Sequence, residues 1–123
     1  MYEIKIVSQF AAAHQLRNYC GGCEKLHGHN WKVEVRVTGK MLDDDGLLID
    51  FRKLKDKTKN ILDELDHEFL NDLDYFEKIN PSSENIARLI FEKLSKDLNE
   101  KGISISRVSA WESDTSCATY FES

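Results

Sequence analysis

The chain has 123 residues, of which 41% are hydrophobic and 32% are charged. This length and composition suit one packed core, and the chain is too short for two. Its formal net charge of -5 argues against a nucleic-acid partner, because polyphosphate backbones attract basic surfaces. The sequence contains no apolar run of the ~18 residues that a bilayer span needs, and its start lacks the features of a signal peptide. We therefore expect one soluble, cytoplasmic domain over residues 1–123, with no membrane partner.

Charge is unevenly distributed along the chain. Residues 1–40 carry a net charge of +3, whereas residues 41–123 carry -8. Three of the four histidines lie in the basic segment. A local positive region can attract an anionic small molecule even to an acidic protein, because nearby charges dominate the field in a cleft.

The first 40 residues contain two runs in which apolar and polar residues alternate. The first covers residues 2–14, and the second places Trp31, Val33, Val35 and Val37 on one face. A period of two is typical of half-buried strands. We expect these strands to pair as a hairpin around residues 15–26, followed by a turn at 43–46 and a short strand at 47–49.

Two amphipathic helices are predicted in the middle of the chain. The first follows Asp50, a suitable N-cap, and has apolar residues at helical spacing up to Leu65. The second begins at Pro81-Ser82-Ser83 and ends near Lys101-Gly102. Strand patterns return over residues 103–121, with a bulged hairpin around 113–116. The order ββααββ predicts an α+β fold, an antiparallel sheet with both helices on one face.

Three histidines share a face of the predicted hairpin. His27 and His29 are separated by one residue, so on a strand they project from the same side as Trp31. His14 shares the face of Phe10 and comes opposite this pair when the two strands pair. Three neutral imidazoles without a fourth protein ligand are typical of a catalytic zinc site with an open position.

The cysteines allow other interpretations. Cys20 and Cys23 form a C-x-x-C pair, which suggests a structural zinc site or a thioredoxin-like redox pair. Neither fits well, because a Cys2His2 site needs its histidines three to five residues apart on a helix, and the redox pair opens a helix in a βαβ unit. Cys23 is the candidate base or nucleophile, since a nearby metal and Lys25 would lower its pKa. Cys20 and Cys117 are predicted to be small, buried or half-buried residues.

Two further groups complete the candidate site. His67 follows Asp66 directly, and a neighbouring carboxylate can fix the tautomer of an imidazole and stabilise its protonated form. Glu112 shares the parity of Val108 and Ala110, so its carboxylate is expected to point inward. The alternatives are an Asp-His pair without function and a solvent-exposed glutamate on an edge strand, because one bulge more or less inverts the side chain.

Taken together, the motifs resemble the 6-pyruvoyl-tetrahydropterin synthase family. The resemblance spans nearly the whole chain in order, and within the family the C-x3-H-G-H spacing is similar to that of the bacterial 6-carboxy-tetrahydropterin synthases of queuosine biosynthesis. A third branch, which cleaves the pterin side chain to a hydroxymethyl group, has glutamate in place of the cysteine, and Glu24 keeps that branch open. The matching motifs are Phe10-Ala-Ala-Ala-His14, Cys23-Glu-Lys-Leu-His27-Gly-His29-Asn30, Gly46-Leu-Leu-Ile-Asp50-Phe51, Leu65-Asp66-His67, Leu70-Asn71, Pro81-Ser-Ser-Glu84-Asn85 and Trp111-Glu112.

The resemblance implies a role for each group. The three histidines would bind Zn²⁺, Cys23 would be the general base, His67 with Asp66 would relay protons, and Glu112 would anchor the pterin. Glu84 is a secondary candidate for the pocket. The fold would be the tunnelling fold, whose subunits pair edge strands into rings, here a homo-oligomer, a hexamer built as a dimer of trimers.

The expected reaction is that of a zinc-dependent lyase. It converts 7,8-dihydroneopterin triphosphate to 6-carboxy-5,6,7,8-tetrahydropterin with release of acetaldehyde and triphosphate, and Arg17 and Lys25 are candidates to receive the triphosphate. The alternatives are a pyruvoyl product, side-chain cleavage to the hydroxymethyl pterin, and a non-catalytic zinc- or pterin-binding module. The last predicts metal binding without turnover.

Overall fold

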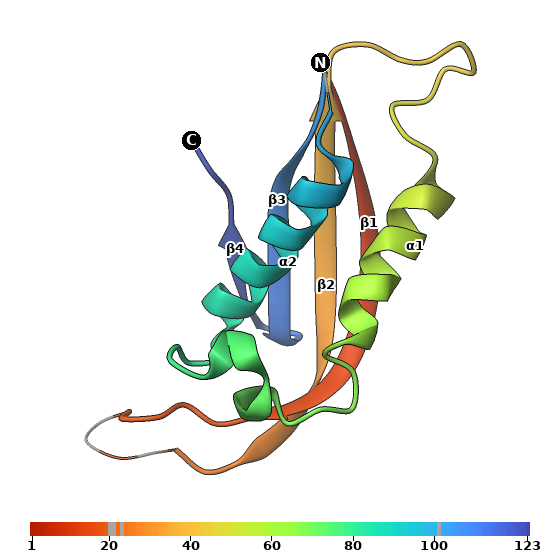
Figure 1. The fold of residues 1–123 in the computed structure, drawn as a ribbon. Coiled ribbons are helices and arrows are strands. Elements are labelled where there is room, and N and C mark those ends of the chain that lie inside the picture. The colour runs from red at the N-terminus through yellow and green to blue at the C-terminus, as the bar shows by residue number, and fades with distance from the viewer. Residues whose placement is uncertain (20–21, 23, 101) are drawn as a thin grey trace.

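The computed structural model describes residues 1–19, 22, 24–100 and 102–123. Four antiparallel strands form one sheet in the order β1-β2-β3-β4, with β1 covering Tyr2–His14, β2 His27–Gly39, β3 Ile103–Ser113 and β4 Ser116–Tyr120. The two long helices lie on the same face of this sheet (Figure 1). The predicted α+β fold with the order ββααββ is therefore confirmed.

The β1-β2 hairpin sets the geometry of the candidate site. Its strands pair without a register shift from Tyr2 opposite Gly39 to His14 opposite His27. The alternating pattern buries one face of each strand, including Phe10, Trp31 and Val33, because successive side chains of a strand point to opposite sides. The hairpin therefore carries all three histidines on its covered face, at the end remote from the N-terminus.

Helix α1 begins at the predicted N-cap, and helix α2 begins within the predicted start signal Pro81-Ser82-Ser83. Helix α1 covers Phe51–Asp63, and the Asp50 carboxylate accepts the backbone N–H of Arg52. Helix α2 covers Ser83–Leu98, and the Ser82 hydroxyl accepts the N–H of Asn85. Helix α1 packs against β1, whereas α2 packs across β3 and β4 (Figure 1).

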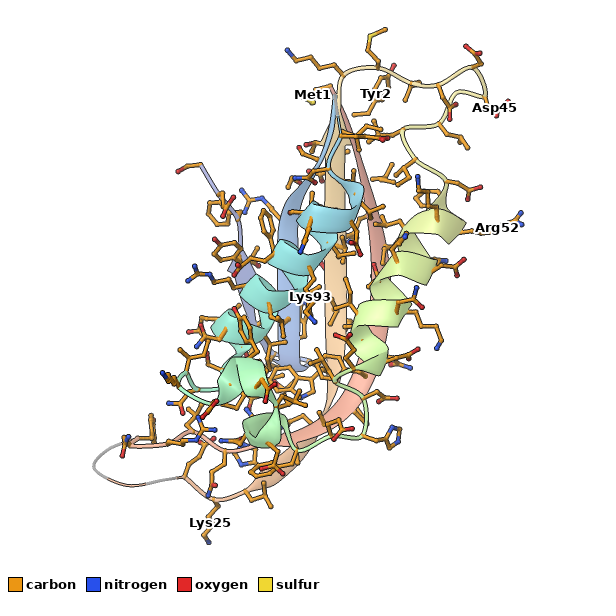
Figure 2. The ribbon with its side chains drawn as sticks, viewed as in Figure 1. Met1, Tyr2, Lys25, Asp45, Arg52 and Lys93 are labelled. Atoms are coloured by element: carbon orange, nitrogen blue, oxygen red, sulfur yellow. The ribbon has the colours of Figure 1, made fainter. Side chains whose placement is uncertain are left out.

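The core lies between the sheet and the helices. It includes Trp31 and Val35 from the sheet, Leu54 from α1 and Ile90 from α2, all fully buried. Charged side chains such as Arg52 and Lys93 project from the outer helix surfaces (Figure 2). No helix among the described residues is long and apolar enough to cross a membrane.

The short strand predicted at 47–49 is wrong, because these residues form a loop. The backbone there is engaged in a local turn: the Asp43 N–H donates to the Leu47 carbonyl, and the Leu47 N–H donates to the Asp43 carboxylate. Leu48 is nevertheless buried. Its apolar side chain therefore packs into the core without sheet pairing.

The segment between α1 and α2, for which the sequence predicts no element, contains two short 3₁₀ helices, η1 at Leu70–Asp72 and η2 at Asp74–Phe76. Before η1, residues 67–69 run along the β1 edge: the His67 N–H donates to the Ala11 carbonyl, the Ala13 N–H to the Glu68 carbonyl. This segment brings Asp66, His67 and the start of α2 to the histidine end of the hairpin.

Candidate metal centre and active site

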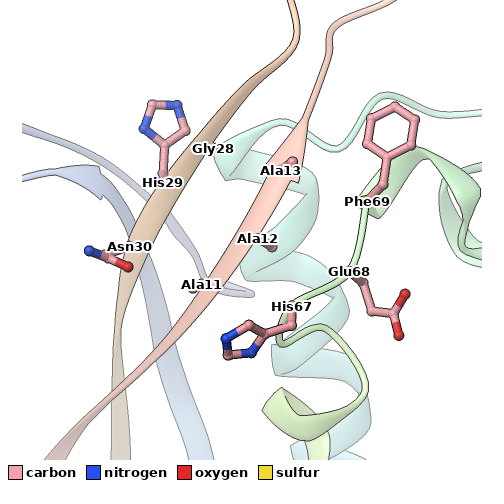
Figure 3. Close-up of a pocket in the computed structure, with 9 residues that line it drawn as sticks. All are labelled: Ala11, Ala12, Ala13, Gly28, His29, Asn30, His67, Glu68 and Phe69. Carbon is pink, nitrogen blue, oxygen red and sulfur yellow. The ribbon is translucent and has the colours of Figure 1, made fainter.

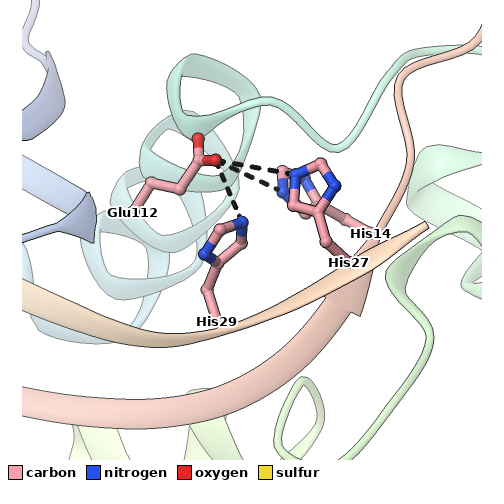
Figure 4. Close-up of side chains that lie close together, drawn as sticks. All are labelled: His14, His27, His29 and Glu112. Atoms are coloured by element: carbon pink, nitrogen blue, oxygen red, sulfur yellow. Dashed lines mark ion pairs between the residues drawn. The ribbon is translucent and has the colours of Figure 1, made fainter. Parts of the chain in front are cut away.

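The structure brings the three predicted histidines together with Glu112. His14 ends β1, His27 begins β2 and His29 lies two residues further along β2. The ligand atoms that these three residues and Glu112 offer all lie within 4.8 Å of one another. Figure 4 shows the three rings converging on one carboxylate. The predicted three-histidine face is therefore present in the structure.

Glu112 reaches the histidines from β3. Its Oε1 lies 3.0 Å from His29 Nε2 and 3.8 Å from the Nε2 atoms of both His14 and His27. The β3-β4 register shifts between Trp111 and Ser113, so Glu112 is the extra residue of a bulge. A bulge can turn a side chain to the other face of a sheet. Here the Glu112 carboxylate lies on the face that carries the histidines, as its parity with Val108 and Ala110 predicts.

Hydrogen bonds fix the tautomers of two of these histidines. His14 Nδ1 lies 2.8 Å from the Pro81 carbonyl oxygen, and His27 Nδ1 lies 2.7 Å from that of Lys25. A carbonyl oxygen can only accept, so Nδ1 carries the proton in each neutral ring. Each Nε2 then presents a lone pair toward the centre of the cluster, as metal-bound histidines do.

The cluster contains polar atoms that lack hydrogen-bond partners. Among the described residues, the buried Nε2 atoms of His14 and His29 have none, and the His29 contact to Glu112 does not have hydrogen-bond geometry. Burial lowers the pKa of His29, although the Glu112 carboxylate partly opposes that effect. Inward-facing imidazole nitrogens without hydrogen-bond partners are the donor set that a divalent metal ion would satisfy, so the residues present fit a metal.

The predicted pair of Asp66 and His67 is formed beside the β1 edge. His67 Nδ1 lies 3.0 Å from Asp66 Oδ2, and the ring is largely exposed, whereas Asp66 Oδ1 accepts the Ala11 N–H at 2.9 Å. This hydrogen bond lowers the pKa of Asp66, with His67 contributing in the same direction. His67 has a φ of 59°, the left-handed region that non-glycine residues seldom adopt.

His67 is not part of the cluster formed by the three other histidines and Glu112. It lines an open hollow of about 460 Å³ together with His29, Phe69 and the small residues of β1 (Figure 3). The hollow adjoins the cluster through His29. A substrate bound here would contact His67 without His67 being a metal ligand.

The remaining predicted site residues have varied positions. Cys23 and Cys20 lie outside the described residues. The side chains of Lys25 and Glu84 are exposed, and Lys25 points away from the sheet (Figure 2). The expectation that Cys117 is buried or half-buried is wrong: it is exposed, because it lies on the edge strand β4 with its side chain on the face that the helices leave uncovered.

Sequence reasoning missed the Pro81 carbonyl near the cluster, and it named Glu24 only through the resemblance to the side-chain-cleaving branch. The Pro81 carbonyl could not be assigned to His14, because 67 residues separate them and a backbone oxygen gives no sequence signal. Glu24 Oε1 lies 3.8 Å from His27 Nε2 and accepts the Leu16 N–H at 3.0 Å. The signal for Glu24 was its place three residues before His27.

The fold and the site define a small α+β protein with a cluster of three histidines, at one end of a β-hairpin, that could hold a metal ion. The sequence profile described as 6-pyruvoyl tetrahydropterin synthase matches residues 3–123. The solved structure of the Caenorhabditis elegans 6-pyruvoyl tetrahydropterin synthase superposes with a TM-score of 0.85 at 28% identity, covering 99% of this chain and 96% of that one. The chain belongs to the 6-pyruvoyl tetrahydropterin synthase family.

Two curated relatives that are similar to this chain have names that describe different activities. The 6-carboxy-5,6,7,8-tetrahydropterin synthase of Haemophilus influenzae is 33% identical, with 99% of this chain and 100% of the relative covered. The dihydroneopterin monophosphate aldolase of Pyrococcus furiosus is 37% identical, with 85% of this chain and 84% of the relative covered. The names of these two relatives describe different reactions on a pterin side chain.

Proposed function

We propose that residues 1–123 form one tetrahydropterin synthase-like domain with 6-carboxy-5,6,7,8-tetrahydropterin synthase activity, as in queuosine biosynthesis. The substrate is 7,8-dihydroneopterin triphosphate, and the products, with water consumed, are the carboxy pterin, acetaldehyde and triphosphate. The observation that carries the proposal is the convergence of three histidine Nε2 atoms and Glu112 Oε1 within 4.8 Å. The full-length similarity to the Haemophilus influenzae synthase and the C-x3-H-G-H spacing favour the carboxy product.

The metal in the proposal is Zn²⁺, held by His14, His27 and His29. Three neutral imidazoles are a zinc ligand set that leaves one position for substrate. Bound zinc supplies Lewis-acid polarisation of substrate oxygens. The chain's own contribution is to direct the Nε2 atoms of His14 and His27 inward, through the hydrogen bonds that their Nδ1 atoms make.

Glu112 anchors the pterin in this proposal. Its carboxylate is partly exposed and lies at the rim of the histidine cluster, so it can accept two adjacent N–H groups of the pterin ring. The same position would suit a fourth metal ligand. The two roles differ in whether metal affinity or substrate affinity depends on the carboxylate.

Proton transfer falls to Cys23 and His67. The Cys23 thiolate takes a proton from the substrate side chain, a role favoured by its spacing of four residues from His27. The Asp66 carboxylate lies 3.0 Å from His67 Nδ1 and orients the ring, and His67 shuttles protons during carbon–carbon cleavage. His67 opens on the hollow that His29 also lines.

The triphosphate needs basic side chains near the histidine cluster. Lys25 is exposed next to His27 and is retained as an anion-binding candidate, and Glu84 as a secondary pocket residue. Arg17 is a weaker candidate, because its guanidinium already donates to the carbonyls of Ile79 and Asn71.

We also propose that the chain works as a homo-oligomer, a hexamer in the arrangement that the family resemblance implies. Strands β1 and β4 are the two edges of the sheet, and open edges favour pairing with another chain. The exposed apolar side chains of Val7 on β1 and Phe121 after β4 suit such an interface. The oligomer would complete the shallow hollow beside His67.

Product analysis tests the proposed function. Incubation of the zinc-loaded protein with 7,8-dihydroneopterin triphosphate, without a reductase, should yield the carboxy pterin and acetaldehyde in equal amounts. A pyruvoyl pterin without acetaldehyde would reassign the branch. Metal binding without any product would support the non-catalytic module instead.

A second candidate function is cleavage of the pterin side chain to a hydroxymethyl group. It is favoured by the similarity to the Pyrococcus furiosus aldolase and by Glu24, whose carboxylate lies 3.8 Å from His27 Nε2 and could act as the base. The hydroxymethyl pterin in the same assay would establish this reaction. Loss of that product in Glu24→Gln, but not in Cys23→Ala, would assign the base.

A further inference from the structure

Two asparagines hold the chain segment that follows the metal-ligand candidate His14. Asn71 Oδ1 accepts the Gln15 N–H at 2.9 Å, and its Nδ2 donates to the Gln15 carbonyl at 2.7 Å. Asn80 does the same with Arg17, accepting at 2.8 Å and donating at 3.0 Å. Each side-chain amide thus replaces a paired strand residue. We name these four residues the asparagine clasp.

The residue between the two clasped positions is held from the other side. Glu24 Oε1 accepts the Leu16 N–H, and the Glu24 N–H donates to the Leu16 carbonyl at 3.0 Å. Gln15 Nε2 also donates to the Glu24 carbonyl at 2.7 Å. All backbone donors and acceptors of residues 15–17 therefore have partners, although the segment lies beyond the end of β1.

Further bonds connect the clasp to the start of helix α2. The Arg17 guanidinium donates to the carbonyls of Ile79 and Asn71, at 3.2 and 3.0 Å. Asn85, in the first turn of α2, donates to the Asn80 carbonyl at 2.8 Å. The segment from 71 to 81 is thereby fixed to the segment from 14 to 17 at several points.

The residue after Asn80 is Pro81, whose buried carbonyl accepts the Nδ1–H of His14 at 2.8 Å. This bond sets the tautomer and direction of the His14 ring, which is 2% exposed. His14 and Pro81, the two partners of this hydrogen bond, lie on the two segments that the clasp joins. We propose that Asn71 and Asn80 are positioning residues, which hold Pro81 against His14 and thereby determine the metal affinity of the site.

This inference rests on the metal centre of the proposed function, and its test uses zinc alone. Zinc affinity is measured by competition with a chromophoric chelator for the wild-type chain, Asn71→Ala, Asn80→Ala and the control Asn60→Ala. Asn60 is exposed on α1 and takes part in none of the hydrogen bonds of the clasp. Loss of an outer partner of a metal-bound histidine weakens affinity 10- to 100-fold, so we expect about that loss in both clasp variants and less than a twofold change in the control.

A second readout follows His14 directly in the metal-free protein. Imidazole ¹⁵N spectra should show His14 protonated at Nδ1 in the wild-type chain and a mixture of tautomers in Asn80→Ala. If Asn80→Ala does not fold, the isosteric Asn80→Asp, which keeps the acceptor and loses the donor, is judged by the same two readouts. A folded variant with wild-type zinc affinity and an unchanged His14 tautomer would overturn the clasp proposal. Failure of the wild-type chain to bind zinc would instead overturn the proposed metal centre.

Discussion

At the scale of single residues, Glu112 is the group whose position most constrains the chemistry. Its Oε1 lies within 3.8 Å of all three histidine Nε2 atoms, yet its proposed partner is the pterin. We predict that Glu112→Gln keeps zinc affinity within about threefold and raises KM at least tenfold, because the amide has one acceptor oxygen and its NH₂ group would face the second N–H donor of the pterin. Chelator competition and steady-state kinetics measure the two effects. A large loss of zinc affinity would show that Glu112 is a fourth ligand.

His67 provides a second test at this scale. Because its φ is 59°, asparagine is the suitable replacement, since it tolerates the left-handed region better than most residues. His67→Asn should preserve the melting temperature and zinc affinity and lower kcat by about 100-fold, within the range of general acid–base catalysis. Full activity in this variant would remove His67 from the mechanism.

At the scale of elements, Asp66 ties the end of the first helical segment to β1 through the Ala11 N–H. That bond lowers the pKa of Asp66 below its usual value. A carboxyl with a lowered folded-state pKa contributes stability above its unfolded pKa of about 3.9, and the contribution is lost as the pH falls through the folded-state pKa. We predict that the stability difference between wild type and Asp66→Asn is largest near neutral pH and shrinks below about pH 4. Urea unfolding of both proteins across this range measures it, and a difference independent of pH would contradict the account.

The elements themselves show what local sequence patterns can predict. Strand alternation, the cap Asp50 and the start signal Pro81-Ser82-Ser83 were sufficient to predict the hairpin and the start of both helices, because those signals are local. The prediction of a strand at 47–49 was wrong, because a turn that buries one leucine, Leu48, has the same apolar pattern as a short strand. The asparagine clasp was inaccessible for a different reason: its hydrogen bonds join residues 56 and 63 positions apart.

At the scale of the whole molecule, the sheet register explains why the site could be predicted largely from sequence. His14 and His27 are directly paired, so strand parity alone brings the three imidazoles together. Glu112 required more, because its side depends on the bulge between Trp111 and Ser113. The net charge of -5 excluded little about the ligand, since the segment that carries the histidines is basic.

The proposed activity requires both the chain and its bound metal. The most direct test is to strip the protein of metal and follow acetaldehyde release from 7,8-dihydroneopterin triphosphate as zinc is added back. The account predicts activity that rises in proportion to bound zinc and reaches its plateau at about one zinc per chain, with His29→Ala inactive throughout. Undiminished acetaldehyde release by the metal-free protein, or zinc-saturated protein that forms no carboxy pterin, would contradict it.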